Sequence, residues 1–118
     1  MRLHKFDIVL VRFPFSDLSK SKFRPALLVK TLPGANAIFC QITTKQRRIK
    51  TFEILLRREH CEGDIRFDSR AYVDMLFTLH HSIIRRKLGR VRNPVICQQV
   101  EEKLTTLFCG ERTRRTAA

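Results

Sequence analysis

The sequence predicts a mainly β (α+β) fold: a small barrel of five to seven short strands with an amphipathic helix at its C-terminus. Short runs of β-branched and aromatic residues recur between turn-forming residues, and the one clear helix pattern lies near the end of the chain. The 118 residues suffice for one domain. Short strands in so small a domain bury their apolar faces when the sheet curls on itself and a helix packs against it. Pattern alone leaves open an SH3-like barrel, an OB-like barrel and an open sheet.

The first predicted strand covers residues 7–15 and is expected to lie in the middle of the sheet. Its apolar residues fill both faces, with Val9, Val11, Phe13 and Phe15 on one face and Ile8 and Leu10 on the other. Pro14 is expected to end its pairing, because proline lacks the N–H that a ladder needs. A polar loop at residues 16–21 follows.

The middle of the chain predicts a series of further short strands. Residues 25–30 and 37–43 are expected to pair as a hairpin, because Pro33, Gly34 and Asn36 between them are turn formers. A basic loop at residues 45–50 precedes the next strand. The later strands are predicted at residues 52–56, 69–74 and 76–79, and residues 83–91 are expected to form a helical turn, a stop at Gly89 and a final extended piece.

The C-terminal helix has the strongest pattern. Asn93 is suited to cap it, Pro94 suits its first position and Gly110 suits its end. Its apolar residues recur on one face: Ile96, Val100, Leu104, Leu107 and Phe108. We therefore predict a single domain at residues 1–110 and a basic, frayed tail at residues 111–118.

The charge predicts a polyanionic partner. Lys and Arg number 24 against 11 Asp and Glu, which gives a net charge of +13. Nucleic acid fits better than a membrane, since no apolar run approaches the roughly 18 residues of a spanning helix. We expect a cytoplasmic protein. The four cysteines form no CxxC pair and have no histidine at zinc-finger spacing, so neither a metal nor another cofactor is expected.

Several motifs resemble those of MazF/PemK-like toxins in order and spacing. They are residues 7–11 (DIVLV), 13–18 (FPFSDL), 24–29 (RPALLV), 41–45 (QITTK), 76–79 (LFTL) and 84–90 (IRRKLGR). The resemblance covers nearly the whole chain. It implies an SH3-like barrel, a homodimer and the toxin of a type II toxin–antitoxin pair that cleaves single-stranded RNA without a metal. It also implies an acidic antitoxin as partner, and contact with DNA only through that antitoxin.

The resemblance assigns catalysis to Arg24 and Thr43. Metal-free cleavage by the 2′-hydroxyl passes through a dianionic phosphorane, and a guanidinium can bond two of its oxygens. A threonine hydroxyl can hold the phosphate. Thr44 is the alternative, because side chains alternate along a strand and only one of the two faces a cleft unless the strand ends between them. Without the resemblance, a surface salt bridge for Arg24 and a plain strand end at Thr43 remain open.

The general base is left unassigned. Known members often carry a glutamate in the loop before the Arg-Pro pair, and this loop has none. Ser19 and Ser21 are possible catalytic or phosphate-positioning residues, while Asp17 is a weaker match. His80 and His81 have the right chemistry for a base but lie in no matching motif.

The RNA is predicted to be held by two lysine-rich loops and two rings. The predicted contacts are Phe15, Lys20, Lys22, Phe23, Lys45, Arg47, Arg48 and Lys50. Any one of these charges is also consistent with an ordinary solvated loop. A second basic cluster at residues 85–92 is expected to face solvent, the antitoxin or RNA beyond the cleft. The alternative function is a non-catalytic module on the same barrel that binds nucleic acid or protein, including a gyrase-directed toxin.

Overall fold

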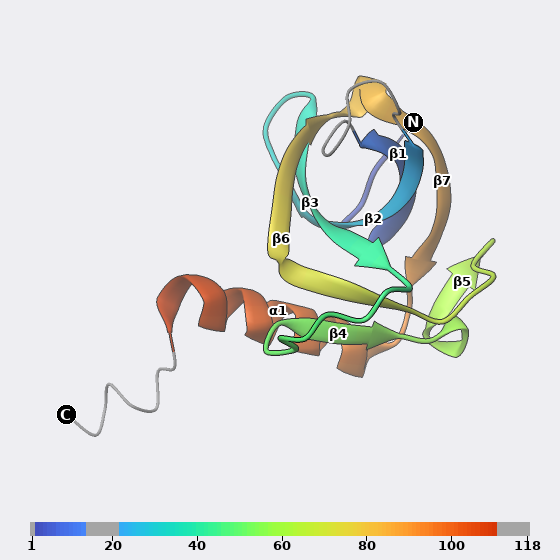
Figure 1. Cartoon of the computed structure of the whole chain (residues 1–118). Helices are drawn as coiled ribbons and strands as arrows, with labels where there is room; N and C mark the ends of the chain where they lie inside the picture. Colours follow the sequence, from blue (N-terminus) through green and yellow to red (C-terminus); the bar gives the residue numbers. More distant parts are fainter. Residues whose placement is uncertain (1, 14–21, 111–118) are drawn as a thin grey trace.

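The protein folds into one curled antiparallel sheet with a helix across one end (Figure 1). The computed structural model describes residues 2–13 and 22–110. The sheet order is β4-β6-β3-β2-β1-β7-β5. The elements are β1 (Asp7–Phe13), β2 (Lys22–Thr31), β3 (Asn36–Thr43), β4 (Glu53–Leu56), η1 (Arg58–His60), β5 (Cys61–Gly63), β6 (Ser69–His80), η2 (His81–Ile83), β7 (Ile84–Val91) and α1 (Pro94–Cys109). The predicted mainly β fold with a C-terminal helix is confirmed.

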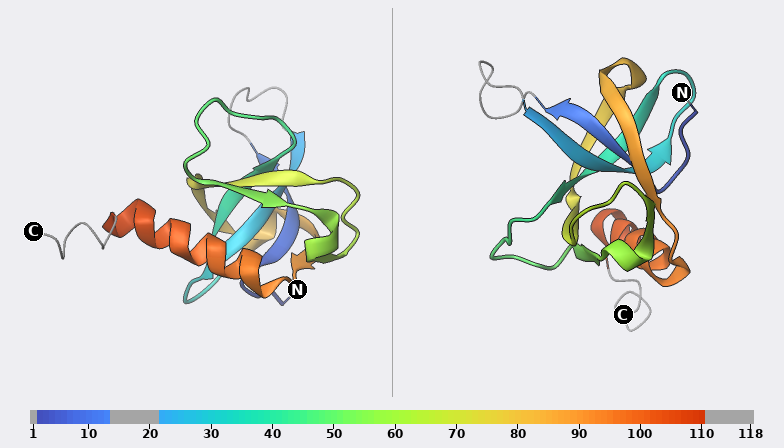
Figure 2. Two further views of the ribbon diagram at one scale, coloured as in Figure 1. Left: turned by 90° about the horizontal axis from the view of Figure 1, so that it is seen from below. Right: turned by 90° about the vertical axis from the view of Figure 1, so that its right-hand side faces the viewer.

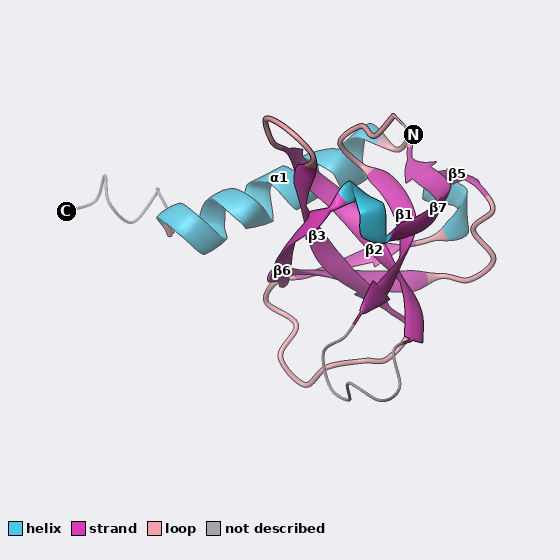
Figure 3. Cartoon of the chain, turned by 90° about the horizontal axis from the view of Figure 1, so that it is seen from above, coloured by secondary structure: helices cyan, strands magenta, loops and turns pink. Residues whose placement is uncertain are grey.

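A bend in β6 curls the sheet, which stays open between its two edge strands, β4 and β5. Its first residues pair with both β3 and β4, and its last residues pair with β3 alone. Between them the register jumps, so that Cys40 lies opposite Leu76 while the next residue, Gln41, lies opposite Tyr72. The prediction of two separate strands here was wrong, because this bulge turns the strand without ending it. Figure 3 shows the curled strands from above, with η2 at the near end.

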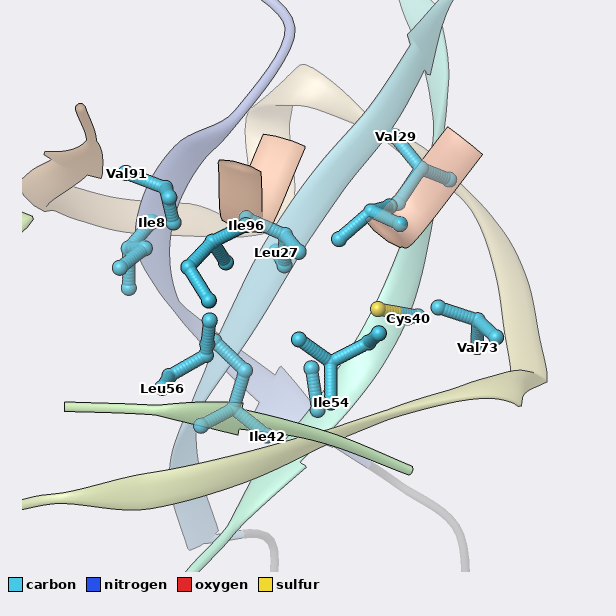
Figure 4. Packing of buried hydrophobic residues seen from close by; sticks show 12 residues of the cluster. Ile8, Leu27, Val29, Cys40, Ile42, Ile54, Leu56, Val73, Val91 and Ile96 are labelled. Atoms are coloured by element: carbon cyan, nitrogen blue, oxygen red, sulfur yellow. The ribbon is translucent and has the colours of Figure 1, made fainter. Parts of the chain in front are cut away.

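Alternation along the central strands divides the buried residues into two clusters. The first contains Ile8 and Leu27 and packs against β4 and α1, where Ile54, Leu56 and Ile96 meet them (Figure 4). The second contains the neighbouring residues Val9, Val11, Ala26 and Leu28, together with Ala37, Phe39 and Ile84. The predicted two-faced, central first strand is confirmed for the part of it that the structure describes.

The helix α1 begins and ends where the sequence predicts. The Asn93 side chain accepts hydrogen bonds from the Val95 and Ile96 amides at 2.9 and 3.2 Å, and Gly110 caps the end with φ +71°. Ile96 and Val100 are buried. Phe108, predicted to share that face, is 72 % exposed, because the end of the helix projects beyond the strands (Figure 2).

The segment from residue 57 to residue 91 differs most from the prediction. The helical turn lies earlier, in η2, and Gly89 lies inside β7 rather than ending an element. The short strand β5 was not predicted; it pairs with β7 at the edge of the sheet. The predicted tail at residues 111–118 lies outside the described residues. In the part of the chain that the structure describes, no helix is long and apolar enough to span a membrane.

Candidate active site

A cleft of about 490 Å³ lies where β1, β2 and β7 meet the end of β3 and the segment from β5 to β6. Its apolar wall includes Ile8, Ile42 and Leu56, all of which are buried in the first core cluster. Its polar lining includes four cationic side chains and one carboxylate: Arg24, Lys45, Arg66, Arg86 and Asp64. The cleft therefore combines an apolar wall with a net positive charge.

Arg24 enters the cleft from β2. It lies opposite Val11 of β1, while the ladder to β3 begins only at Ala26, so Arg24 stands beyond the end of that ladder. Pro25 is paired on the β1 side alone, which suits a residue without an N–H. The Arg24 side chain is half-buried, and among the described residues no hydrogen bond or ion pair occupies its guanidinium.

Thr43 and Thr44 both line this cleft. Thr43 is the last residue of β3, so the strict alternation of a strand ends between the two residues. The Thr43 Oγ1 accepts a hydrogen bond from the Lys45 amide at 3.1 Å. Within the described part of the chain the Thr43 O–H donates to no acceptor, and the backbone fixes where that hydroxyl oxygen lies. The structure thus brings together four of the residues selected from the sequence: Arg24, Thr43, Thr44 and Lys45.

Asp64 links two arginines at the cleft. Its carboxylate accepts from Arg66 Nε at 3.1 Å and from Arg86 Nη2 at 3.0 Å. These hydrogen bonds, the one from Arg86 first, lower the pKa of the Asp64 carboxyl. It is ionised at neutral pH and its basicity is reduced, so it is poorly suited to take a proton from a hydroxyl.

Arg86 was predicted to lie beyond the cleft, and the structure places it in the lining. It pairs opposite Leu10 in the β1–β7 ladder. A signal was available: Leu88 lies two residues further along β7 and also lines the cleft, so period two puts both on one face. Four other residues of the lining were not predicted, since no sequence pattern predicted β5: Asp64, Arg66, Phe67 and Ser69.

Arg47 has a structural partner. Its guanidinium makes two bonds to the Asp74 carboxylate, at 3.1 and 2.7 Å, and lies 3.8 Å from the centre of the Tyr72 ring. Its amide also donates to the Tyr72 hydroxyl at 3.0 Å. These contacts tie the segment between β3 and β4 to the bend of β6. Arg47 therefore holds this segment and does not line the cleft.

The other predicted RNA contacts fall into two groups. Lys22, Arg48 and Lys50 are exposed but do not line the cleft, and Phe23 is 43 % exposed with Arg12 and Arg85 over its ring at 5.0 and 5.9 Å. The remaining residues lie outside the described part of the chain: Phe15, Asp17, Ser19, Lys20 and Ser21.

None of the four histidines lines the cleft. His81 lines a separate hollow at the far end of β6, where the neighbouring His80 ring stacks on it at 4.5 Å. His4 and His60 do not line the cleft either. Within residues 2–13 and 22–110, no three side chains of His, Cys, Asp or Glu come together as metal ligands would.

Comparisons with known proteins point to one family. The family model described as "PemK-like, MazF-like toxin of type II toxin-antitoxin system" matches residues 4–108. A search of curated proteins found no match.

Solved structures with the same fold are distant in sequence. A mycobacterial endoribonuclease in complex with its cognate antitoxin is 16 % identical at a TM-score of 0.69, covering 91 % of this chain and 95 % of the other. The Deinococcus radiodurans MazE–MazF complex is 17 % identical at a TM-score of 0.68, covering 88 % of this chain and 94 % of the other. The Mycobacterium tuberculosis toxin MazF-mt6 is 18 % identical at a TM-score of 0.66, covering 86 % of this chain and 95 % of the other. These likenesses concern the fold.

Proposed function

The chain belongs to the PemK-like, MazF-like toxin family of type II toxin–antitoxin systems, and on that premise we propose that it is a metal-independent endoribonuclease. Its substrate is single-stranded RNA, including mRNA. The observation that carries this proposal is the shared cleft of Arg24, Thr43 and Lys45, in which no described residue occupies the Arg24 guanidinium. Two of the solved structures with this fold are named endoribonucleases.

The chemistry is an attack within the RNA itself. The 2′-oxygen bonds to phosphorus, the bond from phosphorus to the 5′-oxygen breaks, and a 2′,3′-cyclic phosphate and a 5′-hydroxyl result. One proton leaves the 2′-hydroxyl and one reaches the departing 5′-oxygen. Arg24 bonds two non-bridging oxygens as their charge grows, and Thr43 donates its O–H to the same phosphate. The residues that move the two protons are not assigned.

The partners follow from the same premise. In the proposed role the protein is a cytoplasmic homodimer that an acidic antitoxin inhibits, and it meets DNA only through that antitoxin. Two of the similar solved structures contain an antitoxin. The net charge of +13 supports a polyanionic substrate and an acidic inhibitor alike.

The test is cleavage of end-labelled single-stranded RNA by antitoxin-free protein in the presence of EDTA. We expect discrete cuts with cyclic-phosphate ends. Arg24→Ala should lower kcat by about 100- to 1,000-fold, the usual effect of losing a donor to a transition-state oxyanion. Thr43→Val, which keeps the shape and removes the hydroxyl, should also lower kcat.

Two matched controls separate the cleft from general effects. Lys30→Ala removes one positive charge from an exposed position of the same strand as Arg24. Thr105→Val removes a hydroxyl that donates to the Glu101 carbonyl within α1. Both should cleave as the wild type does. RNA binding without cleavage by wild type and all variants would show a non-catalytic binding module instead.

A further inference from the structure

Phe67 is a large apolar side chain exposed at the cleft. It lies between Arg66 and Asp68 in the segment that joins β5 to β6, it lines the cleft, and it is 71 % exposed. A single exposed apolar residue needs no explanation by itself. This one adjoins the cationic lining described above, and burial in the core does not explain its position.

The segment that carries Phe67 is anchored at both ends. At one end, the Asp64 amide donates to the Leu88 carbonyl at 2.7 Å, next to the paired glycines Gly63 and Gly89. At the other end, the Asp68 carboxylate accepts from the Arg58 amide at 2.8 Å. The segment is therefore already ordered before a ligand contacts Phe67, so binding costs less conformational entropy.

The charges around Phe67 fit a ligand that is both anionic and aromatic. Asp64 fixes Arg66 and Arg86, yet their side chains remain 76 % and 53 % exposed and keep further N–H donors. Aromatic rings and guanidinium planes are the surfaces on which unpaired bases stack. An RNA strand whose phosphate lies at Arg24 and Thr43 offers a base to the same cleft, and this favours RNA over an acidic peptide.

We infer that Phe67 stacks one unpaired base of the RNA and so positions the strand for cleavage, with Arg66 and Arg86 contacting the adjoining backbone. The inference rests on the proposed function and deepens it, since it names the part of the cleft that recognises a base. Phe67 is a substrate-positioning residue and takes no part in the proton transfers.

The kinetic test compares three substitutions of Phe67. Phe67→Ala should lower kcat/KM for single-stranded RNA by about 5- to 150-fold, the range expected for one lost base stack. The loss should lie mainly in KM, because stacking holds substrate and transition state alike. Phe67→Tyr keeps a ring and should retain most of the activity. Phe67→Leu keeps apolar bulk without a ring and should resemble Phe67→Ala.

The matched control is Phe108→Ala. Phe108 is 72 % exposed, like Phe67, and it lies in the last turn of α1, on the other side of the molecule from β5 (Figure 1). Its substitution should leave kcat/KM unchanged. Equal activity of Phe67→Leu and Phe67→Tyr would reduce the role of Phe67 to apolar contact, and unchanged activity of Phe67→Ala would remove it. Either result overturns the inference while RNA cleavage by the wild type stands.

A second readout does not depend on cleavage. Fully 2′-O-methylated oligonucleotides carry no nucleophile, and 2-aminopurine placed at successive positions loses fluorescence when it stacks on a ring. We expect quenching at one position with wild type and Phe67→Tyr, and none with Phe67→Ala. A fluorescent Glu/Leu peptide tests the alternative partner. If the wild type binds this peptide and Phe67→Ala does not, while every RNA readout of Phe67→Ala stays unchanged, Phe67 belongs to a protein-docking surface and the inference is refuted. A wild type that neither cleaves nor binds RNA would refute the proposed function itself.

Discussion

Cys61 shows how burial sets the chemistry of a single residue in the cleft wall. The thiol is half-buried, and desolvation, helped by the nearby Cys97 and Asp68, raises its pKa to about 11. Burial disfavours the charged thiolate. At neutral pH the group is therefore an uncharged part of the lining, and it does not repel a phosphate.

We predict that Cys61 reacts slowly with iodoacetamide. A pKa of about 11 in place of 9.0 leaves about 100-fold less thiolate at pH 8, and the thiolate is the nucleophile. The rate should keep rising with pH up to about 11. The measurement is the alkylation rate of the Cys61 peptide by mass spectrometry, with glutathione as the internal reference. A rate that matches glutathione at pH 8, or that levels off below pH 9, contradicts the prediction.

The same shift links this residue to alkaline stability. Below pH 9 the thiol is protonated in both the folded and the unfolded protein, so it adds no pH dependence. Between about 9 and 11 the unfolded chain loses the proton first. The contribution of Cys61 to folding stability therefore falls as pH rises through this window.

At the scale of elements, the pairing of β5 with β7 depends on two glycines that lie opposite each other. A Cβ on Gly89 would lie 2.1 Å from the Glu62 carbonyl oxygen, and a Cβ on Gly63 would lie 2.5 Å from that of Leu88. Gly63 also has φ +102°, a region that other residues rarely adopt. The close approach brings β5, and with it residues 64–67, to the cleft.

We predict that Gly89→Ala opens this edge. The clash is with backbone, which cannot rotate away, so we expect a loss of about 1–3 kcal/mol in the free energy of unfolding, as for other overpacked sites. Hydrogen exchange of the Asp64 amide should accelerate and RNA cleavage should fall. Urea unfolding and exchange measurements check both effects.

Gly34 provides the contrast for this prediction. Its Cβ would meet nothing within 4 Å, although its φ of +86° makes alanine strained. Gly34→Ala should therefore cost about 1–2 kcal/mol through backbone strain and leave cleavage unchanged. If Gly34→Ala impairs cleavage as much as Gly89→Ala does, global destabilisation explains the loss and the role of the β5–β7 pairing is refuted.

The elements were predictable where local signals agree with tertiary packing. The α1 boundaries follow from Asn93, Pro94 and Gly110, whose preferences depend on the backbone alone. The three-residue β5 has no periodicity to detect, and its strand conformation comes from pairing with β7. Gly89 was predicted to stop an element and instead lies inside β7. A glycine is typical of a turn and equally of a strand position that another backbone approaches closely.

At the scale of the whole molecule, some residues reach the cleft through a local hairpin and others through strand pairing over long sequence distances. That Arg24 and Thr43 lie near each other could be expected from the sequence, because they flank the predicted hairpin strands at residues 25–30 and 37–43, whereas the role expected of them rested on the family resemblance. The place of Asp64, Phe67 and Arg86 could not be expected, because they reach the cleft through the pairing of β7 with β1 and β5. The composition predicted the sign of the cleft's charge and not which cations supply it.

The net charge of +13 raises the question of whether RNA is held by the cleft or by the whole surface, and salt dependence separates the two. Each phosphate contact on a single strand steepens the plot of log K against log salt concentration by about 0.7. Arg24→Ala should therefore make the plot shallower by about 0.7 for a fully 2′-O-methylated RNA, which the protein can bind and not cleave.

Lys30→Ala removes the same charge from an exposed site outside the cleft, on the same strand. If the RNA is neutralised by specific cleft contacts, this variant keeps the wild-type slope, because no counterion leaves a phosphate at Lys30. If the RNA is held instead by charges spread over the whole surface, those charges act together through their long-range field. The slopes of the two variants should then fall by the same amount. Fluorescence titrations between 50 and 300 mM salt would distinguish the outcomes, and equal slopes for the two variants would refute a localised site.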